Sequence, residues 1–165
     1  MIAKEAGLSK PNMLYYFASK DAIYRALLAQ LLADWLEPIY TIDADGDPVD
    51  VILDYAKRKL AMSRDYPRES RLFANEVIQG APHIGDVLSG ELRDVIDRLA
   101  EVIDGWVAAG RMRPVDPYHL VFTIWSVTQH YADFDVQVRA ILGDKDPFVG
   151  AEQHLEDMLR RLLRD

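Results

Sequence analysis

The sequence predicts an all-α protein, and three features of the chain support that fold class. Apolar residues recur three or four positions apart through nearly all of its 165 residues. No stretch shows the strict alternation of a half-buried strand, and prolines and glycines divide the chain into helix-sized segments. The expected helices span residues 21–40, 49–64, 67–80, 85–109, 117–142 and 148–164.

The composition indicates a globular protein without covalent cross-links. Half of the residues are apolar and none is cysteine, which excludes disulfides and thiolate metal sites and suits a cytoplasmic protein. No apolar run reaches the length that crosses a bilayer, so we expect no membrane contact.

Residues 1–20 predict two short helices joined by a tight turn. Gly7 can adopt the positive φ that ends a helix. Ser9 can cap the following helix, and Pro11 fits its first turn. This arrangement is typical of a helix-turn-helix, whose second helix enters the DNA major groove.

The charge distribution agrees with DNA contact at one end of the molecule. Residues 1–20 hold three lysines against one glutamate, a net +2, which leaves −10 for the remainder of a chain whose total charge is −8. A small basic end on an acidic body suits a protein that touches phosphates at that end only.

The 21–40 segment predicts a long helix that ends near Pro38. Its expected apolar face consists of Ile23, Leu27, Leu31, Trp35 and Ile39. The aspartates of the following 41–48 loop have calcium-loop spacing, but a misplaced Gly46 and the lack of a glutamate at the twelfth loop position favour an ordinary turn.

The last two helices predict a dimer interface. In 117–142, apolar residues at alternating steps of four and three form a heptad seam of Leu120, Ile124, Val127, Tyr131, Phe134, Val138 and Ile141. The other side of that helix is also largely apolar, and 148–164 carries a seam of its own, Ala151, Leu155, Met158 and Leu162. Two such helices from each of two subunits would form a four-helix interface in a homodimer. The alternative is a monomer whose other helices cover both faces.

Gln129, one helical turn after Trp125, is the main candidate for ligand recognition. A glutamine offers one acceptor and two donors in a plane, which match the C=O and N–H edge of a pyrimidine or a similar imide. Trp125 provides a flat stacking surface, and Trp35 can close the same pocket. The alternative is a core glutamine bonded to backbone, to Asn75 or to Thr128.

Other polar residues receive structural interpretations. Arg71, in an otherwise apolar helix with Asn75 and Glu76, is expected to form an internal ion pair with Glu76 or Asp133 rather than to bind a ligand. His130 and Asp133 share a helical face and could begin a metal site, but a capping or interhelical hydrogen bond is the commoner use. We therefore expect no metal and no cofactor.

No catalytic residues are expected, because the chain lacks a phosphate loop, a nucleophile motif and a clear acid–base pair.

The N-terminal motif resembles the TetR family of bacterial repressors. The likeness rests on Ile2-Ala3-x-x-Ala6-Gly7-Leu8-Ser9, an aromatic pair ending in Phe17, and Lys20 three residues later. Further matches to pyrimidine-responsive members include Ser63-Arg64-Asp65-Tyr66-Pro67 and Thr128-Gln129-His130-Tyr131.

The resemblance implies a ligand-responsive transcriptional regulator that represses by binding operator DNA as a homodimer and is released by a small planar effector such as a pyrimidine. Residues 1–20 would form a helix-turn-helix continuing into the 21–40 helix, and 21–165 the ligand-binding and dimerisation domain. The implied pocket residues are Trp125 and Gln129. The implied DNA-facing residues are Lys10, Pro11, Asn12, Leu14, Tyr15, Tyr16 and Lys20.

The family pattern also has a helix before the position of Ile2, so a truncated helix-turn-helix is expected here. The alternative function is a ligand-sensing and dimerisation module that does not bind DNA.

Overall fold

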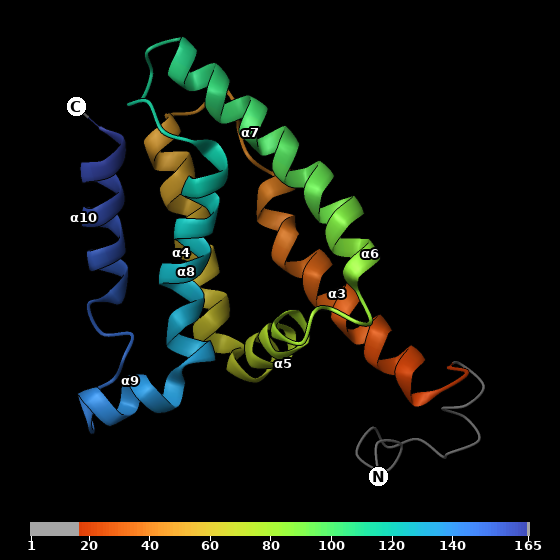
Figure 1. The fold of residues 1–165 in the computed structure, drawn as a ribbon. Coiled ribbons are helices and arrows are strands. Elements are labelled where there is room, and N and C mark those ends of the chain that lie inside the picture. Colours follow the sequence, from red (N-terminus) through yellow and green to blue (C-terminus); the bar gives the residue numbers. More distant parts are fainter. Residues whose placement is uncertain (1–16, 165) are drawn as a thin grey trace.

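The computed structural model describes residues 17–164, and all regular structure in this range is helical, as the sequence predicted (Figure 1). The elements are α3 (Lys20–Tyr40), α4 (Pro48–Asp65), α5 (Pro67–Ile78), α6 (Gly85–Val87), the π-helical turn η1 (Leu88–Leu92), α7 (Arg93–Ala108), α8 (Pro117–Asp133), α9 (Asp135–Leu142) and α10 (Ala151–Leu163). None of these helices is long and apolar enough to span a bilayer.

Side-chain caps fix where three of the long helices begin. The Ser19 hydroxyl accepts a hydrogen bond from the backbone N–H of Ala22 at 3.0 Å and so starts α3. Asp47 and Asp116 cap α4 and α8 in the same way, each followed by a proline in the first helical turn. The interpretation of residues 41–48 as a turn is consistent with this, because Asp47 is the cap of α4.

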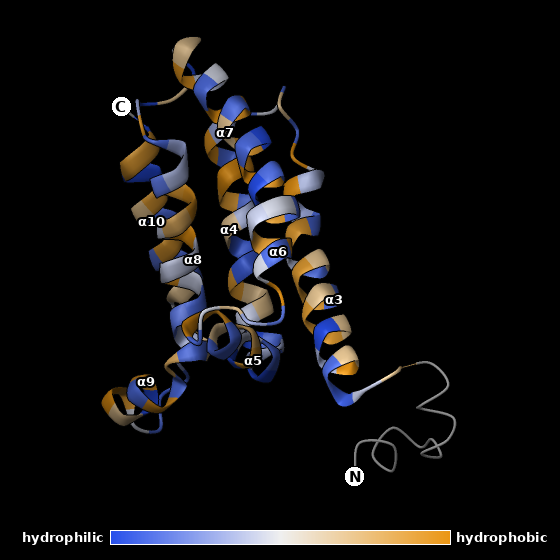
Figure 2. Ribbon diagram, turned by 45° about the vertical axis from the view of Figure 1, so that its right-hand side comes forward, coloured by the Kyte–Doolittle hydropathy of each residue, from blue (hydrophilic) through white to orange (hydrophobic). Residues whose placement is uncertain are grey.

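Helix α4 lies in the middle of the bundle. It packs against α8, α10, α3 and α5, and its inward residues Ile52, Leu53 and Ala56 are almost completely buried. Helix α7 covers α3 and α8 and presents a polar outer face (Figure 2). The core therefore runs along α4, and side chains from α3, α5 and α8 converge on it.

The predicted continuous helix over 117–142 is wrong. The chain leaves helical geometry at Phe134, and α9 runs away from α8 at the base of the bundle (Figure 1). The guanidinium of Arg71 on α5 donates to the carbonyl oxygen of Ala132 at 3.0 Å. The Ser70 hydroxyl donates to Asp133 at 2.5 Å. Both contacts hold the end of α8 against α5, so the break is imposed by packing.

Part of the predicted heptad seam is not available to a second subunit. Leu120 and Ile124 of α8, and Leu155 of α10, are buried within their own subunit's core. Phe134 and Ile141, at the other end of the seam, are exposed because the helix breaks between them. The seam residues that remain accessible to a partner are Leu162, which is exposed, and Val127, Tyr131 and Met158, which are only partly buried.

Three smaller expectations also need correction. Helix α3 continues through Pro38 to Tyr40, and its buried stripe includes Leu28, Leu32 and Leu36, whereas Leu27 is 44% exposed. The 85–109 segment contains a π-helical turn rather than one regular helix. The last helix begins at Ala151 instead of residue 148, after Gly150 in a left-handed conformation.

Candidate effector cavity

A partly enclosed cavity of about 50 Å³ lies where α3, α4, α5, η1 and α8 meet. It brings together the three predicted ligand-binding residues, Trp35 from α3 and Trp125 and Gln129 from α8. The other residues lining it are Leu32, Leu36, Tyr55, Lys59, Phe73 and Leu92.

The aromatic walls of the cavity are held by their neighbours. The Trp35 ring meets Phe73 edge-on, with 5.0 Å between centroids. The Trp125 indole N–H donates to the Tyr55 hydroxyl at 2.7 Å. Burial raises the pKa of Tyr55 to about 12, so its hydroxyl stays protonated and keeps a proton to donate in turn. The two indole rings are thus fixed before any ligand arrives.

The Gln129 amide has no hydrogen-bond partner among residues 17–164. Both alternative partners are otherwise placed, because the Thr128 hydroxyl donates to the Ile124 carbonyl at 2.7 Å and Asn75 is exposed on α5. Gln129 itself is half-buried and lines the cavity. Its donors and acceptor are therefore available to a molecule inside it.

Lys59 was not singled out from the sequence, yet it lines the same cavity. Its side chain is only 5% exposed, and its ammonium lies 4.8 Å from the centre of the Trp35 ring. Burial lowers the pKa of Lys59 to about 8, although Asp133 pulls it upward. The available signal was its spacing, four residues after Tyr55 on the buried side of α4.

Arg71 does not form the predicted ion pair. Its guanidinium binds the backbone of α8, while Glu76 accepts hydrogen bonds from His83. Burial raises the pKa of Asp133, although the Ser70 hydroxyl, Lys59 and Arg71 favour the ionised carboxylate. Arg71 therefore favours the ionised form of Asp133 through its charge at longer range, while its guanidinium binds the last turn of α8.

Glu76 joins α5 to the N-terminal half of α3. One carboxylate oxygen accepts the backbone N–H of His83 at 2.7 Å, and the other lies 3.0 Å from the His83 ring nitrogen Nδ1. The Tyr24 ring of α3 meets the His83 ring edge-on at 5.0 Å. On the same helix, Arg25 donates to the carbonyl oxygen of His83 and pairs with Asp86. We call Tyr24, Arg25, Glu76, His83 and Asp86 the α3 latch.

The described residues contain no group of three or more histidine, aspartate or glutamate side chains that could hold a metal ion. The His130 ring stacks on Phe134 with centroids 5.0 Å apart. The Asp133 carboxylate is held by Ser70. Both side chains thus have structural partners.

Most of the predicted DNA-facing residues lie outside the described range, namely Lys10, Pro11, Asn12, Leu14, Tyr15 and Tyr16. Lys20 is described, and it is exposed as the first residue of α3, directly after the Ser19 cap. The helix that starts beside the predicted DNA reader is therefore the one that carries Trp35 into the cavity.

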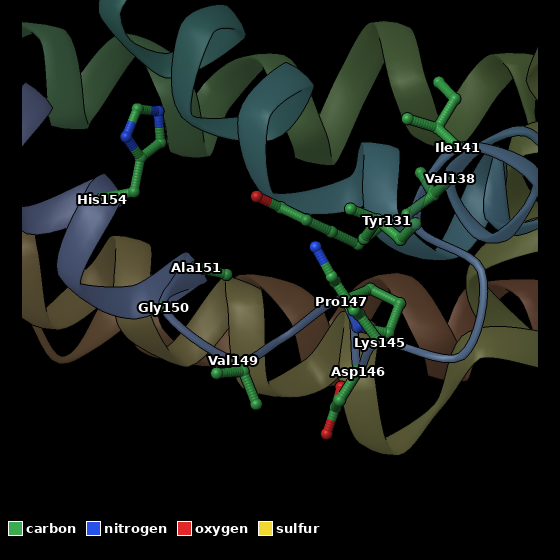
Figure 3. A pocket seen from close by; sticks show the side chains of 11 residues that line it. Tyr131, Val138, Ile141, Lys145, Asp146, Pro147, Val149, Gly150, Ala151 and His154 are labelled. Atoms are coloured by element: carbon green, nitrogen blue, oxygen red, sulfur yellow. The ribbon is translucent and has the colours of Figure 1, made fainter.

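A larger, open groove of about 680 Å³ runs between the end of α8, α9 and the start of α10. Figure 3 shows Val138 and Ile141 at one end of it and His154 at the other. Tyr131, Lys145 and Asp146 also line it, but no tryptophan or glutamine does. The smaller cavity is the better candidate for a planar ligand because it alone encloses flat rings around an unpartnered amide.

Comparison with known proteins gives two family matches and several curated relatives. Residues 28–164 match the family model described as the YcdC-like protein C-terminal region, and residues 1–27 match that of the bacterial regulatory proteins, tetR family. The HTH-type transcriptional regulator RutR of Escherichia coli K12 is 50% identical over 142 residues, which cover 86% of this chain and 67% of the relative. The RutR proteins of Escherichia coli O157:H7 and Shigella flexneri match with the same identity and coverage.

Proposed function

This chain belongs to the TetR family of bacterial transcriptional regulators, and on that premise we propose that it is a repressor released from operator DNA by a small planar metabolite such as a pyrimidine. Its relatives are regulators, and the protein is a regulator rather than an enzyme.

The observation that carries the proposal is the unpartnered Gln129 amide in a cavity that is also lined by Trp35 and Trp125. The Gln129 amide is half-buried and is not sealed from water, so a ligand with complementary donors and acceptors can replace the water at its edge. Trp35 and Trp125 supply flat surfaces for a ring. A planar imide satisfies both requirements at once.

The size of the cavity restricts the ligand further. A space of about 50 Å³ holds roughly three or four ordered water molecules. A single ring enters with small side-chain adjustments, whereas a sugar or phosphate would force the helices apart. The proposed effector is therefore a free base or a similar ring, not a nucleotide.

The proposed division of labour follows the chain. Residues 1–20 read DNA and continue into α3, and residues 21–165 bind the effector and dimerise through 117–142 and 148–164. Lys10, Lys20, Tyr15 and Tyr16 would contact mainly phosphates, and Asn12 a base edge. The two readers of a symmetric dimer would sit about 34–36 Å apart, one DNA turn.

Helix α3 is the proposed link between effector and DNA. Its Trp35 lines the cavity, and its first residue, Lys20, lies at the DNA end. A ligand that prefers one position of α3 shifts the spacing of the two readers, and a differential affinity of a few kcal/mol is enough to change occupancy.

The test compares the parent with Gln129→Leu, which keeps the side-chain volume and removes the amide. Uracil or thymine should raise the Tm of the parent in proportion to occupancy. Gln129→Leu should keep the fold and lose that response by at least about tenfold in affinity, because one or two hydrogen bonds are gone.

Gln79→Leu is the matched control, since Gln79 is exposed at the end of α5 and away from the cavity. It should respond to pyrimidines like the parent. An undiminished response in Gln129→Leu would make the amide a core residue, and no response in any variant would remove pyrimidines from the proposal.

A further inference from the structure

Lys59 is the one charged residue among the described residues that line the cavity. Buried charges in proteins are normally paired, because an unpaired ammonium loses its hydration without compensation. Lys59 carries three N–H donors, and none has a hydrogen-bond acceptor in the part of the chain that the structure describes. The ammonium lies over Trp35, at the wall of the cavity.

The charged neighbours of Lys59 do not meet this need. Asp133 on α8 lies beyond ion-pairing distance of the ammonium and is bonded to Ser70 instead. Arg71 on α5 is a second cation beside the same carboxylate. Tyr55 on α4 is protonated and bonded to Trp125. Asp133 therefore acts on the ammonium only at longer range, and no described residue accepts a hydrogen bond from it.

We propose that Lys59 is a specificity-determining residue for a negatively charged oxygen on the effector, so that the cavity prefers a planar ring that is ionised over a neutral ring of the same shape. The inference rests on the proposed function of the cavity and adds the charge of the ligand to it. Lys59 would donate to the ionised oxygen, Gln129 would read an amide-like edge, and the tryptophans would hold the ring.

The depressed pKa of Lys59 supports this interpretation. In the empty cavity, burial disfavours the ammonium and its pKa lies near 8. An anion beside it reverses that effect and restores the charged form. A bound anion therefore offsets the desolvation penalty of the Lys59 ammonium, and a neutral ring offsets less of that penalty.

The experiment measures the Kd values of uracil and barbiturate at pH 7 by calorimetry. Both are planar six-membered rings with an imide edge, but barbiturate has one more exocyclic oxygen and is ionised at this pH, whereas uracil is neutral. The parent should bind barbiturate roughly tenfold more tightly, the difference between a charged and a neutral hydrogen bond. Lys59→Met should bring the ratio of the two Kd values close to one.

Lys57→Met is the matched control, since Lys57 stands two residues away on α4 but pairs with Glu156 and Glu152 outside the cavity. It should keep the preference of the parent. Circular dichroism of each variant establishes that the helices are intact, and Lys59→Met is expected to fold because it removes an unpaired buried charge.

Two outcomes would overturn the proposed role of Lys59 and leave the proposed function of the cavity standing. If the parent binds uracil as tightly as barbiturate, while Gln129→Leu loses uracil, the cavity reads neutral rings and only the proposed function stands. If the preference for barbiturate survives in Lys59→Met, another group provides it.

A third probe, benzoate, separates this inference from the proposed function, because it is a planar anion without an imide edge. Binding of benzoate that depends on Lys59, with no binding of uracil or barbiturate, would support the anion site and reject imide recognition. If none of the three probes binds, both proposals are wrong.

Discussion

Lys59 lies in surroundings that disfavour its charge. Its pKa lies near 8 in the folded protein, against 10.5 for an ordinary lysine. That difference corresponds to about 3 kcal/mol of lost stability while the ammonium stays charged in both states. Binding sites commonly keep such costs because the same group recognises the ligand.

Replacing Lys59 by methionine should therefore stabilise the protein without ligand. The expected rise in Tm at pH 7 is on the order of 10 °C. Because the folded pKa is lowered, the unfolded chain binds the extra proton, and the stability of the parent rises with pH between about 8 and 10.5. The advantage of Lys59→Met should be full below pH 8 and shrink across that window in thermal melts at several pH values.

Lys57→Met tests whether this effect belongs to the buried position. Lys57 forms partly exposed ion pairs, so its loss should cost up to about 1 kcal/mol and lower the Tm slightly. A Tm gain for Lys59→Met that does not change with pH would mean that improved packing, not relief of a charge, is responsible.

At the scale of the helices, the sequence predicts helix ends that depend on adjacent residues but not the helix break that depends on tertiary contacts. The predicted start at residue 117 and the predicted ends at residues 80 and 109 lie within two residues of the observed ones. Asp116 caps α8, and Gly80 and Gly110 have positive φ just after α5 and α7, and such caps and left-handed turns are properties of a few adjacent residues. The break at Phe134 has no such local sign. It depends on Ser70 and Arg71, some sixty residues earlier in the chain.

The same distinction applies to the candidate cavity. Trp125 and Gln129 could be grouped because they lie one turn apart on a helix and match pocket residues of the family. Trp35 could be added because it lies on the apolar face of the helix that follows the predicted DNA reader. Lys59 sits in the sequence Lys57-Arg58-Lys59, which looks like a solvated basic run. Only the packing of α4 against α3 and α8 shows that the third of these residues is buried.

The corrected orientation of α8 and α10 changes which residues test the proposed dimer. Leu155 lies in the core, so Leu155→Asp should unfold the subunit rather than separate two subunits. Leu162 lies on the outer side of α10 and is 43% exposed. Leu162→Asp should weaken dimerisation by roughly 3 kcal/mol, on the order of a hundredfold in Kd, while the helix content is unchanged.

Sedimentation of both variants beside Val77→Asp checks this prediction. Val77 on α5 is equally exposed, at 43%, but lies outside the proposed interface. It should leave the oligomeric state alone. Equal dissociation of the Leu162 and Val77 variants would reject the α10 surface as the contact.

At the scale of the whole molecule, α3 connects the cavity to the DNA end and is fixed at two distant points. The α3 latch holds its N-terminal half to α5 and the following segment. Near its other end, the Tyr40 hydroxyl donates to Glu91 at 3.4 Å. Movement of Trp35 by a ligand can reach Lys20 only if α3 moves as one body, and the latch lies between these two positions.

Glu76 is the buried centre of the α3 latch. Glu76→Gln should therefore weaken the coupling between effector binding and DNA binding more than it weakens effector binding itself. Burial opposes its charge, but hydrogen bonds from His83 outweigh this effect and hold the pKa of Glu76 below its ordinary value. A neutral amide loses those charge-assisted bonds. We expect the factor by which the effector weakens DNA binding to fall about fivefold, a coupling change of roughly 1 kcal/mol, while the effector Kd changes less than about threefold.

The measurement is a gel shift on operator fragments selected from genomic DNA, with and without saturating uracil or barbiturate. Glu91→Gln is the matched control, because it makes the same chemical change at the other end of α3, where the hydrogen bond is long and exposed. Since coupling is reciprocal, the same factor must appear when the effector is titrated into the protein–DNA complex. A full effector response in Glu76→Gln would mean that α3 is moved from the cavity alone and that the latch only stabilises the fold.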